Sequence, residues 1–109
     1  MDNKAKKLLF DILTSINNID EYIGKQKDFM KYDSNAMMQD AVERNLEIIG
    51  EATSRLLKIE PNINITNSRR IIDARNKIIH GYDEIENVQI WSIIINHLPL
   101  LKKEIQNYI

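Results

Sequence analysis

The sequence predicts an all-α protein that folds as an up-and-down bundle of four to five helices. Gly and Pro are scarce, with three and two residues in 109, which disfavours turn-rich sandwiches and barrels. Apolar residues recur at steps of three and four along most of the chain. The composition, 43% hydrophobic and 28% charged, is typical of a globular chain with one core. Residues 1–109 are therefore expected to form a single domain.

The first two predicted helices fill the N-terminal half. One runs from about Asn3 to Ile23, and the next begins after a cap at Ser34 or Asn35 and ends near Lys58. In both, the apolar spacing is that of a helix packed in a bundle. Gly24 and the charged, aromatic residues 25–33 interrupt the pattern. At about 1.5 Å per residue, each helix would span roughly 30 Å or more, as in an antiparallel bundle.

A shorter third helix is predicted after a polar connection. Pro61 opens this connection, and Asn67 or Ser68 is placed to cap the helix. The helix is expected to run to His80, where Gly81 provides a C-terminal stop.

The last helix is expected from about Glu84 to Tyr108, with a kink near Ile95 caused by Pro99. It is apolar on more than one side, because three isoleucines lie outside its main stripe. A four-helix monomer would leave part of that surface exposed, so either a subunit interface or a thick core is expected there. The three residues are Ile90, Ile93 and Ile94.

Charge and amino-acid usage exclude several classes of protein. Lys and Arg number 15 against 16 Asp and Glu, so the net charge of −1 is far from the basic footprint of a dedicated nucleic-acid binder. The absence of Cys excludes disulfides, thiolate metal sites and cysteine nucleophiles. No cofactor is predicted, and no acidic residue lies three positions before His80 or His97, as a di-metal carboxylate bundle requires. The apolar run broken by Asp11 fits neither a signal peptide nor a membrane span, so a cytoplasmic location is expected.

Residues 69–82 hold the most informative pattern. On an ideal helix with about 100° per residue, Arg75 falls near the centre of an apolar arc. A guanidinium on an inward face must be ion-paired, reach the surface or bind an anion, because an unpaired buried charge is too costly. Glu47 and Glu51, four residues apart on the second predicted helix, can brace it. Spacing alone also fits a purely structural ion pair.

His80 and Asn76 complete the candidate site. His80 follows Arg75 by five residues, so the two side chains point about 140° apart on one regular helix. They converge on one phosphate only if the helix end is distorted at Gly81, or if a two-fold axis brings in a second copy of the helix. Asn76 shares a face with His80 and can orient the imidazole or donate to a phosphate oxygen. A helix-terminal His also fits a simple cation near the carbonyl end.

Several segments together resemble one family. The string from Arg75 to Tyr82 resembles the motif of HEPN domains, an Arg-Asn pair with a His five after the Arg, and its trailing Gly-Tyr is similar to the HepT-like branch. Residues 44–47 and 49–52 are similar to that family's Arg-Asn-Leu-Glu and Ile-Gly-Glu-Ala signature, and Trp91 with the Leu-Pro pair at 98–99 also fits. The resemblance covers about residues 5–107. Residues 73, 74 and 83 depart from the family pattern, which puts the substrate preference in doubt.

The resemblance implies a dimeric helical bundle that acts as a metal-independent ribonuclease toxin. It implies an antitoxin partner, a minimal nucleotidyltransferase of the MNT type, in a complex with the homodimer or in a larger hetero-oligomer. Carried over to this sequence, Arg75 and His80 form the catalytic pair at the dimer interface and Asn76 is the accompanying polar residue. Tyr82 is the residue that the antitoxin modifies with AMP.

These residue types suit cleavage of RNA by its own 2′-hydroxyl, leaving a 2′,3′-cyclic phosphate. An imidazole titrates near neutral pH and can move the hydroxyl proton, while an arginine stabilises the charged phosphorane. The alternative is a non-catalytic module that binds a nucleotide or the nucleotidyltransferase through Arg75 and Asn76. Three further cations can hold flanking phosphates or form a solvated face, and His97 is interpreted as a packing or surface residue. The three cations are Arg69, Arg70 and Lys77.

Overall fold

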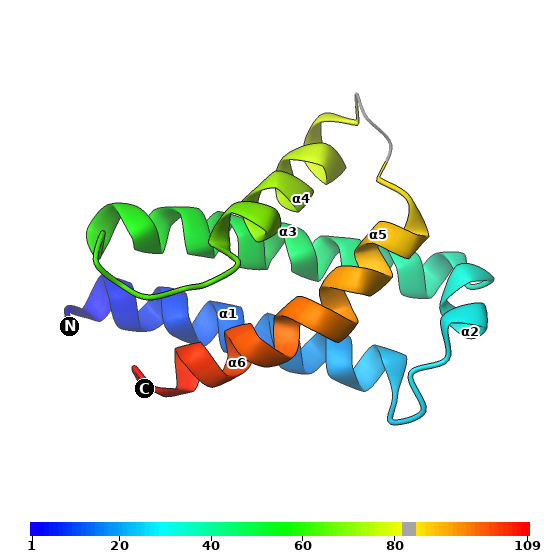
Figure 1. Cartoon of the computed structure of the whole chain (residues 1–109), viewed down its shortest axis with the longest axis horizontal. Coiled ribbons are helices and arrows are strands. Elements are labelled where there is room, and N and C mark those ends of the chain that lie inside the picture. Colours follow the sequence, from blue (N-terminus) through cyan, green and yellow to red (C-terminus); the bar gives the residue numbers. More distant parts are fainter. Residues whose placement is uncertain (82–84) are drawn as a thin grey trace.

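The computed structural model describes residues 1–81 and 85–109, and its regular elements there are all helical, which confirms the all-α prediction. Figure 1 shows α1 (Asn3–Ile23) and α3 (Ala36–Ile59) side by side as the base of the bundle. The helix α4 (Ser68–His80) lies obliquely against α3, and the C-terminal helix runs diagonally over the pair. Within the described residues, no helix is long and apolar enough to cross a bilayer.

Capping side chains set the ends of the long helices close to the predicted positions. The Asp2 carboxylate accepts the N–H of Ala5 at 2.8 Å at the start of α1. The Asn35 side chain accepts the N–H of Met38 at 3.0 Å at the start of α3. The helix α4 ends at Gly81, as predicted, with a φ of +63° that glycine adopts without strain.

A short helix, α2 (Phe29–Asp33), lies inside the segment that was expected only to interrupt the bundle. Its Tyr32 is fully buried, and burial raises the pKa of that phenol well above its usual value. The Tyr32 and Trp91 rings lie 5.5 Å apart, and Phe29 meets the same indole edge-on at 5.6 Å. Little more than one helical turn is too short to show a period, which is why the pattern missed it.

The C-terminal helix is one run of three pieces, α5 (Asn87–Ser92), a π-helical segment η1 (Ile93–His97) and α6 (Leu98–Gln106). Where the sequence predicts a kink near Ile95, the structure has this π-helical segment. The Leu98 N–H donates to the Ile93 carbonyl, five residues back rather than four. Pro99 follows directly and has no N–H for the carbonyl of Ile95. The wider turn accommodates the proline without ending the helix.

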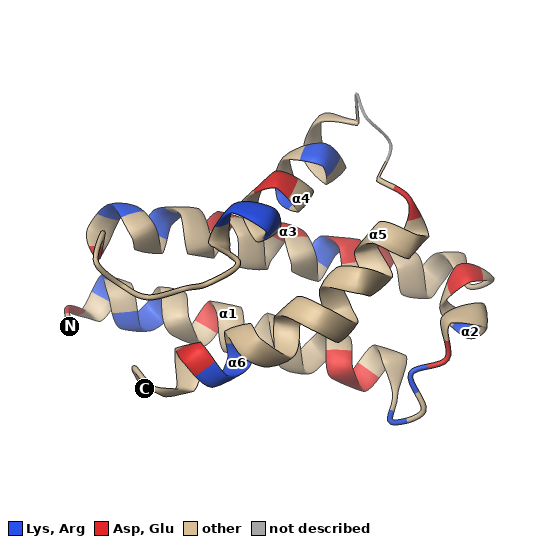
Figure 2. Ribbon diagram, in the orientation of Figure 1, with Lys and Arg blue, Asp and Glu red and all other residues tan. Residues whose placement is uncertain are grey.

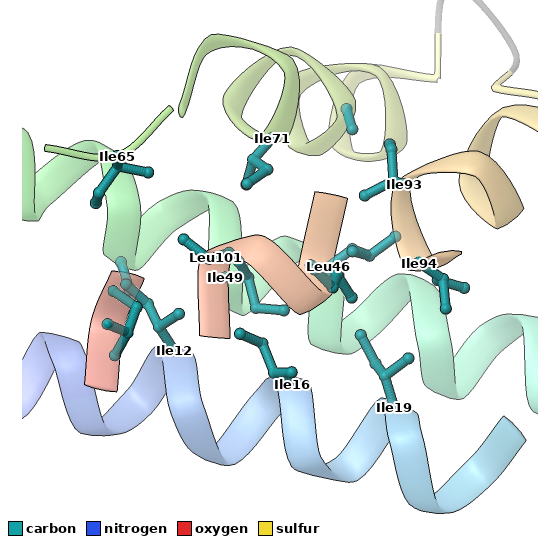
Figure 3. Close-up of a cluster of buried hydrophobic side chains, with 14 of the residues drawn as sticks. Ile12, Ile16, Ile19, Leu46, Ile49, Ile65, Ile71, Ile93, Ile94 and Leu101 are labelled. Atoms are coloured by element: carbon teal, nitrogen blue, oxygen red, sulfur yellow. The ribbon is translucent and has the colours of Figure 1, made fainter. Parts of the chain in front are cut away.

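The three isoleucines outside the main stripe of this helix belong to the monomer's own core. Ile90, Ile93 and Ile94 are 1%, 8% and 4% exposed. Figure 3 shows Ile93 and Ile94 among side chains from α1 and α3. The thick-core interpretation is therefore confirmed for these three residues, which offer little exposed surface for a subunit interface.

Candidate functional site

Arg75 lies where α4 comes closest to α3. A Cβ atom added to Gly50 of α3 would overlap the Arg75 Cβ and lie 2.8 Å from its Cγ. The glycine therefore lets the two helices approach until the arginine stem fills the place of a side chain on α3. The Arg75 side chain is 27% exposed, so the guanidinium is largely enclosed, as its inward position on the predicted helix requires.

Two hydrogen bonds fix the Arg75 guanidinium. Its Nη2 donates to Glu51 Oε2 of α3 at 2.7 Å, and its Nη1 donates to Asn76 Oδ1 at 2.8 Å. The second oxygen of the same carboxylate, Glu51 Oε1, accepts from Arg55 Nε at 2.9 Å. One carboxylate thus holds two arginines, which restricts the rotamers of all three side chains.

A groove of about 340 Å³ opens beside this cluster, between α3, α4 and α1. We call it the Arg75 groove. Three arginines line it, and each has a carboxylate partner within it: Arg44 Nη1 lies 3.2 Å from Glu47 Oε2, and Arg55 and Arg75 share Glu51. Apolar side chains also line it, among them Leu8, Ile48 and Ile79, of which Ile79 is 46% exposed.

His80 lies on a different side of α4. It is the last residue of the helix, its side chain is exposed, and it does not line the Arg75 groove. The helix stays α-helical through His80, so the ideal separation of about 140° from Arg75 applies. A distorted helix end, one of the two predicted ways to bring Arg75 and His80 together, is therefore not observed. The described part of one chain does not place both side chains in one groove.

Other predicted residues have mixed outcomes. Glu51 braces Arg75 as predicted, whereas Glu47 is wrong in that role, because it pairs with Arg44. The Asn76 oxygen is engaged by Arg75, and its predicted contact with the His80 imidazole stays a prediction. Tyr82 lies outside the described residues.

Gly50 and Arg55 were not singled out from the sequence as parts of this site. A glycine inside a helix costs roughly 1 kcal/mol relative to alanine, so Gly50 near the middle of α3 was the available sign of a close helix approach. Among residues 1–81 and 85–109, no group of three or more His, Asp and Glu side chains is arranged to hold a metal ion.

The sequence was compared with known families and proteins. A family model described as ribonuclease HepT-like matches residues 12–108. A protein of Methanocaldococcus jannaschii named "Putative RNase MJ1380" is 36% identical over 94% of this chain and 94% of its own length. A second protein of that organism, named "Putative RNase MJ0125", is 30% identical over 95% of this chain and 90% of its own. A Thermococcus cleftensis protein named "Probable ribonuclease HepT" is 30% identical over 94% and 93%. No solved structure matches the chain significantly.

Proposed function

Because the chain belongs to the HepT-like ribonuclease family, we propose that it is a ribonuclease that cuts RNA with Arg75 and His80. The observation that carries this proposal is the fixed guanidinium of Arg75, held by Glu51 and Asn76 at the wall of an open groove. A preorganised cation costs little reorganisation when charge develops on a phosphate, so it stabilises the transition state.

The proposed reaction is attack of the RNA 2′-hydroxyl on the adjacent phosphate. His80 either removes the hydroxyl proton or protonates the leaving 5′-oxygen, and water exchanges the other proton. Arg75 donates N–H groups to the phosphorane oxygens. The bond to the 5′-oxygen breaks, and the product strand ends in a 2′,3′-cyclic phosphate. These residue types carry the reaction without a metal ion.

The proposed site is composite, made by two copies of the chain. Arg75 and His80 point about 140° apart on α4, so a two-fold axis that sets Arg75 of one copy against His80 of the other joins them. The apolar side chains that line the Arg75 groove support such a contact. Half-buried Leu8 and Ile48 and exposed Ile79 gain burial in a dimer.

The proposed physiological role is that of a toxin in the cytoplasm, silenced by an antitoxin. The antitoxin is a minimal nucleotidyltransferase of the MNT type that transfers AMP to the hydroxyl of Tyr82. Tyr82 follows His80 by two residues in the sequence, so a bound AMP adds negative charge and bulk near the catalytic imidazole and repels RNA phosphate.

The experiment that tests the enzyme proposal compares purified wild type with three variants on total RNA in EDTA. Arg75→Ala and His80→Ala are expected to lose cleavage by about 100-fold or more, the size typical of removing a transition-state donor or an acid–base group. Arg55→Ala is the matched control, because it removes another arginine from the same groove and the same carboxylate. It is expected to keep most of the activity.

The chemistry of the new RNA ends is measured in the same experiment. Cyclic phosphate ends that depend on Arg75 and His80 support the proposed reaction. If wild type with an unmodified Tyr82, checked by mass spectrometry, leaves RNA intact, the enzyme proposal is wrong. The chain is then better described as a non-catalytic module that binds a nucleotide or the nucleotidyltransferase.

A further inference from the structure

A second groove runs along the other flank of α4, facing the C-terminal helix. Its volume is about 310 Å³, similar to that of the Arg75 groove. We call it the α4–η1 groove. The side chains that line it and can bind a ligand come from both walls: Arg70, Asp73 and Lys77 from α4, and Gln89, Ser92 and His97 from α5 and η1.

The two cations of this groove have no carboxylate partner among the described residues. Asp73 is spaced three residues after Arg70 and four before Lys77, which suits helix ion pairs, yet it pairs with neither within the part of the chain that the structure describes. Among the described residues that line the groove, the opposite wall adds no acid. Residues 87–101 contain no Asp, Glu, Lys or Arg, and the ribbon of α5 and η1 is tan in Figure 2. The groove therefore keeps a net positive charge.

His97 adds a hydrogen-bond donor to the same groove. It is the last residue of the π-helical segment η1, and its side chain is half-buried. Burial, and secondarily the charge of Arg70, lower the pKa of His97 below its usual value. The imidazole is therefore neutral at physiological pH and still carries one N–H. Arg70 and His97 line the groove from opposite walls.

We propose that the α4–η1 groove binds a backbone phosphate of an RNA strand, through Arg70, Lys77 and His97. The inference rests on the proposed function, because it is the proximity of His80 that favours RNA as the anion. Lys77 precedes His80 by three residues on α4, about 4.5 Å along the helix axis, and Arg70 precedes it by ten, about 15 Å. A strand with its scissile phosphate at His80 can thus continue along α4 into the groove.

The binding experiment uses a labelled single-stranded RNA in which every 2′-hydroxyl is methylated. Such RNA lacks the nucleophile and stays intact, so fluorescence anisotropy measures binding alone over a series of salt concentrations. The variants are Arg70→Gln and Lys77→Gln. The matched control is Arg69→Gln. Arg69 is exposed on the same helix and does not line the groove, so we assign it to the solvated face rather than to a phosphate contact.

Arg70→Gln and Lys77→Gln are expected to weaken binding about three- to tenfold each. Each is also expected to reduce the slope of log affinity against log salt by roughly 0.7, the contribution of one phosphate contact on a single strand. Arg69→Gln is expected to bind within about twofold of wild type. Equal affinities and slopes for all three variants, or no binding of the RNA by wild type, would overturn the proposal.

Cleavage of unmodified RNA, measured in parallel, separates this inference from the proposed function. If wild type cuts RNA and the three variants bind alike, the groove proposal fails and the ribonuclease proposal stands. If only the groove variants lose affinity and no protein cuts RNA, the groove proposal stands alone. If the groove variants lose affinity for poly-glutamate and bind RNA as wild type does, the groove takes an acidic protein segment and the RNA proposal is wrong.

Discussion

The two flanks of α4 use arginine and lysine in opposite ways. On the flank against α3, each arginine of the Arg75 groove has a carboxylate partner, and Glu51 serves two of them. On the flank against η1, Arg70 and Lys77 have none among the described residues, and the facing wall is uncharged. Pairing fixes a guanidinium in one position, whereas an unpaired cation stays available to an incoming anion. We therefore assign the cation that stabilises the transition state to the first flank and strand binding to the second.

The difference also explains how a chain with a net charge of −1 can act on RNA. The charges of the Arg75 groove nearly cancel. That groove therefore positions the Arg75 guanidinium but attracts RNA little over long distances. The affinity for RNA is expected to depend on the few unpaired cations of α4, and hence to be modest and sensitive to salt.

The largest expected effect comes from filling the space that brings α4 onto α3. Gly50→Ala places a Cβ against the Arg75 stem, so α4 must shift away from α3. The free energy of unfolding is expected to fall by about 1–3 kcal/mol, as for other overpacked contacts, with a clear loss of RNA cleavage. Urea unfolding measures the first effect.

The control for Gly50→Ala is Ser54→Ala, one helical turn further along α3 and only half-buried, which is expected to change stability by less than about 0.5 kcal/mol. Full stability and activity in Gly50→Ala would show that the close approach of the helices is unimportant.

The next largest effect is expected on the cleavage rate of a Glu51 variant, which tests whether Glu51 acts by positioning Arg75. Glu51→Gln keeps one acceptor oxygen but loses the second acceptor oxygen and the negative charge, which together hold Arg75 and Arg55. We expect kcat to fall about tenfold and KM to change little, because the loss is felt as charge develops on the phosphate. Steady-state cleavage kinetics give both numbers.

Glu47→Gln is the matched control for Glu51→Gln, since Glu47 lies in the same groove on the same helix and pairs only with Arg44. Equal losses in the two variants would mean that the groove responds to total charge and that Glu51 has no special role.

On the other flank of α4, a substitution is expected to strengthen RNA binding, by a smaller factor than the losses above. Among the described residues, Asp73 is the one acidic side chain that lines the α4–η1 groove. Asp73→Asn is therefore expected to make RNA bind about two- to threefold more tightly. Anisotropy with the methylated RNA measures the change. Asp40→Asn, an exposed position on α3, makes the same change of charge away from the groove and is expected to have less effect. Weaker binding by Asp73→Asn would contradict the assignment of this flank.

The smallest effect concerns His97 and pH. Its pKa is lower in the folded chain than its ordinary value near 6.5, so the unfolded chain binds more protons as the pH falls through this range. The contribution of His97 to stability is therefore present above about pH 6.5 and is lost below it. His97→Gln is expected to flatten the fall in stability between about pH 7 and 5, measured by urea unfolding. A curve that keeps its slope in the variant would assign the slope to other groups.

The sequence predicted most of the fold because long periodic helices and their caps are local features. Asn35 and Gly81 marked helix ends that the structure has at those residues. The sequence left open whether Ile93 and Ile94 face a subunit interface or a thick core. On an ideal helix Ile94 lies about 40° from Ile90 and Ile93 about 60° from it, so the three form one stripe. Which stripe faces the core depends on how the C-terminal helix packs on α1 and α3.

The site was predictable in part for the same reason. The inward position of Arg75 followed from the helical wheel, and a carboxylate on the neighbouring helix followed from the cost of an enclosed charge. Which carboxylate braces Arg75 and why Gly50 is needed both depend on how α3 and α4 pack. The α4–η1 groove depends on a contact between segments about 20 residues apart, which no local pattern encodes.

The composite site is the central claim, and mixing two inactive variants tests it most directly. Arg75→Ala and His80→Ala are co-expressed with different tags, and the mixed dimer is purified through both. One of its two sites then combines an intact Arg75 from one chain with an intact His80 from the other. We predict that RNA cleavage returns, to about half of the wild-type level per mixed dimer. A mixed dimer that forms and stays inactive, or a wild-type monomer that cuts RNA, would contradict the account.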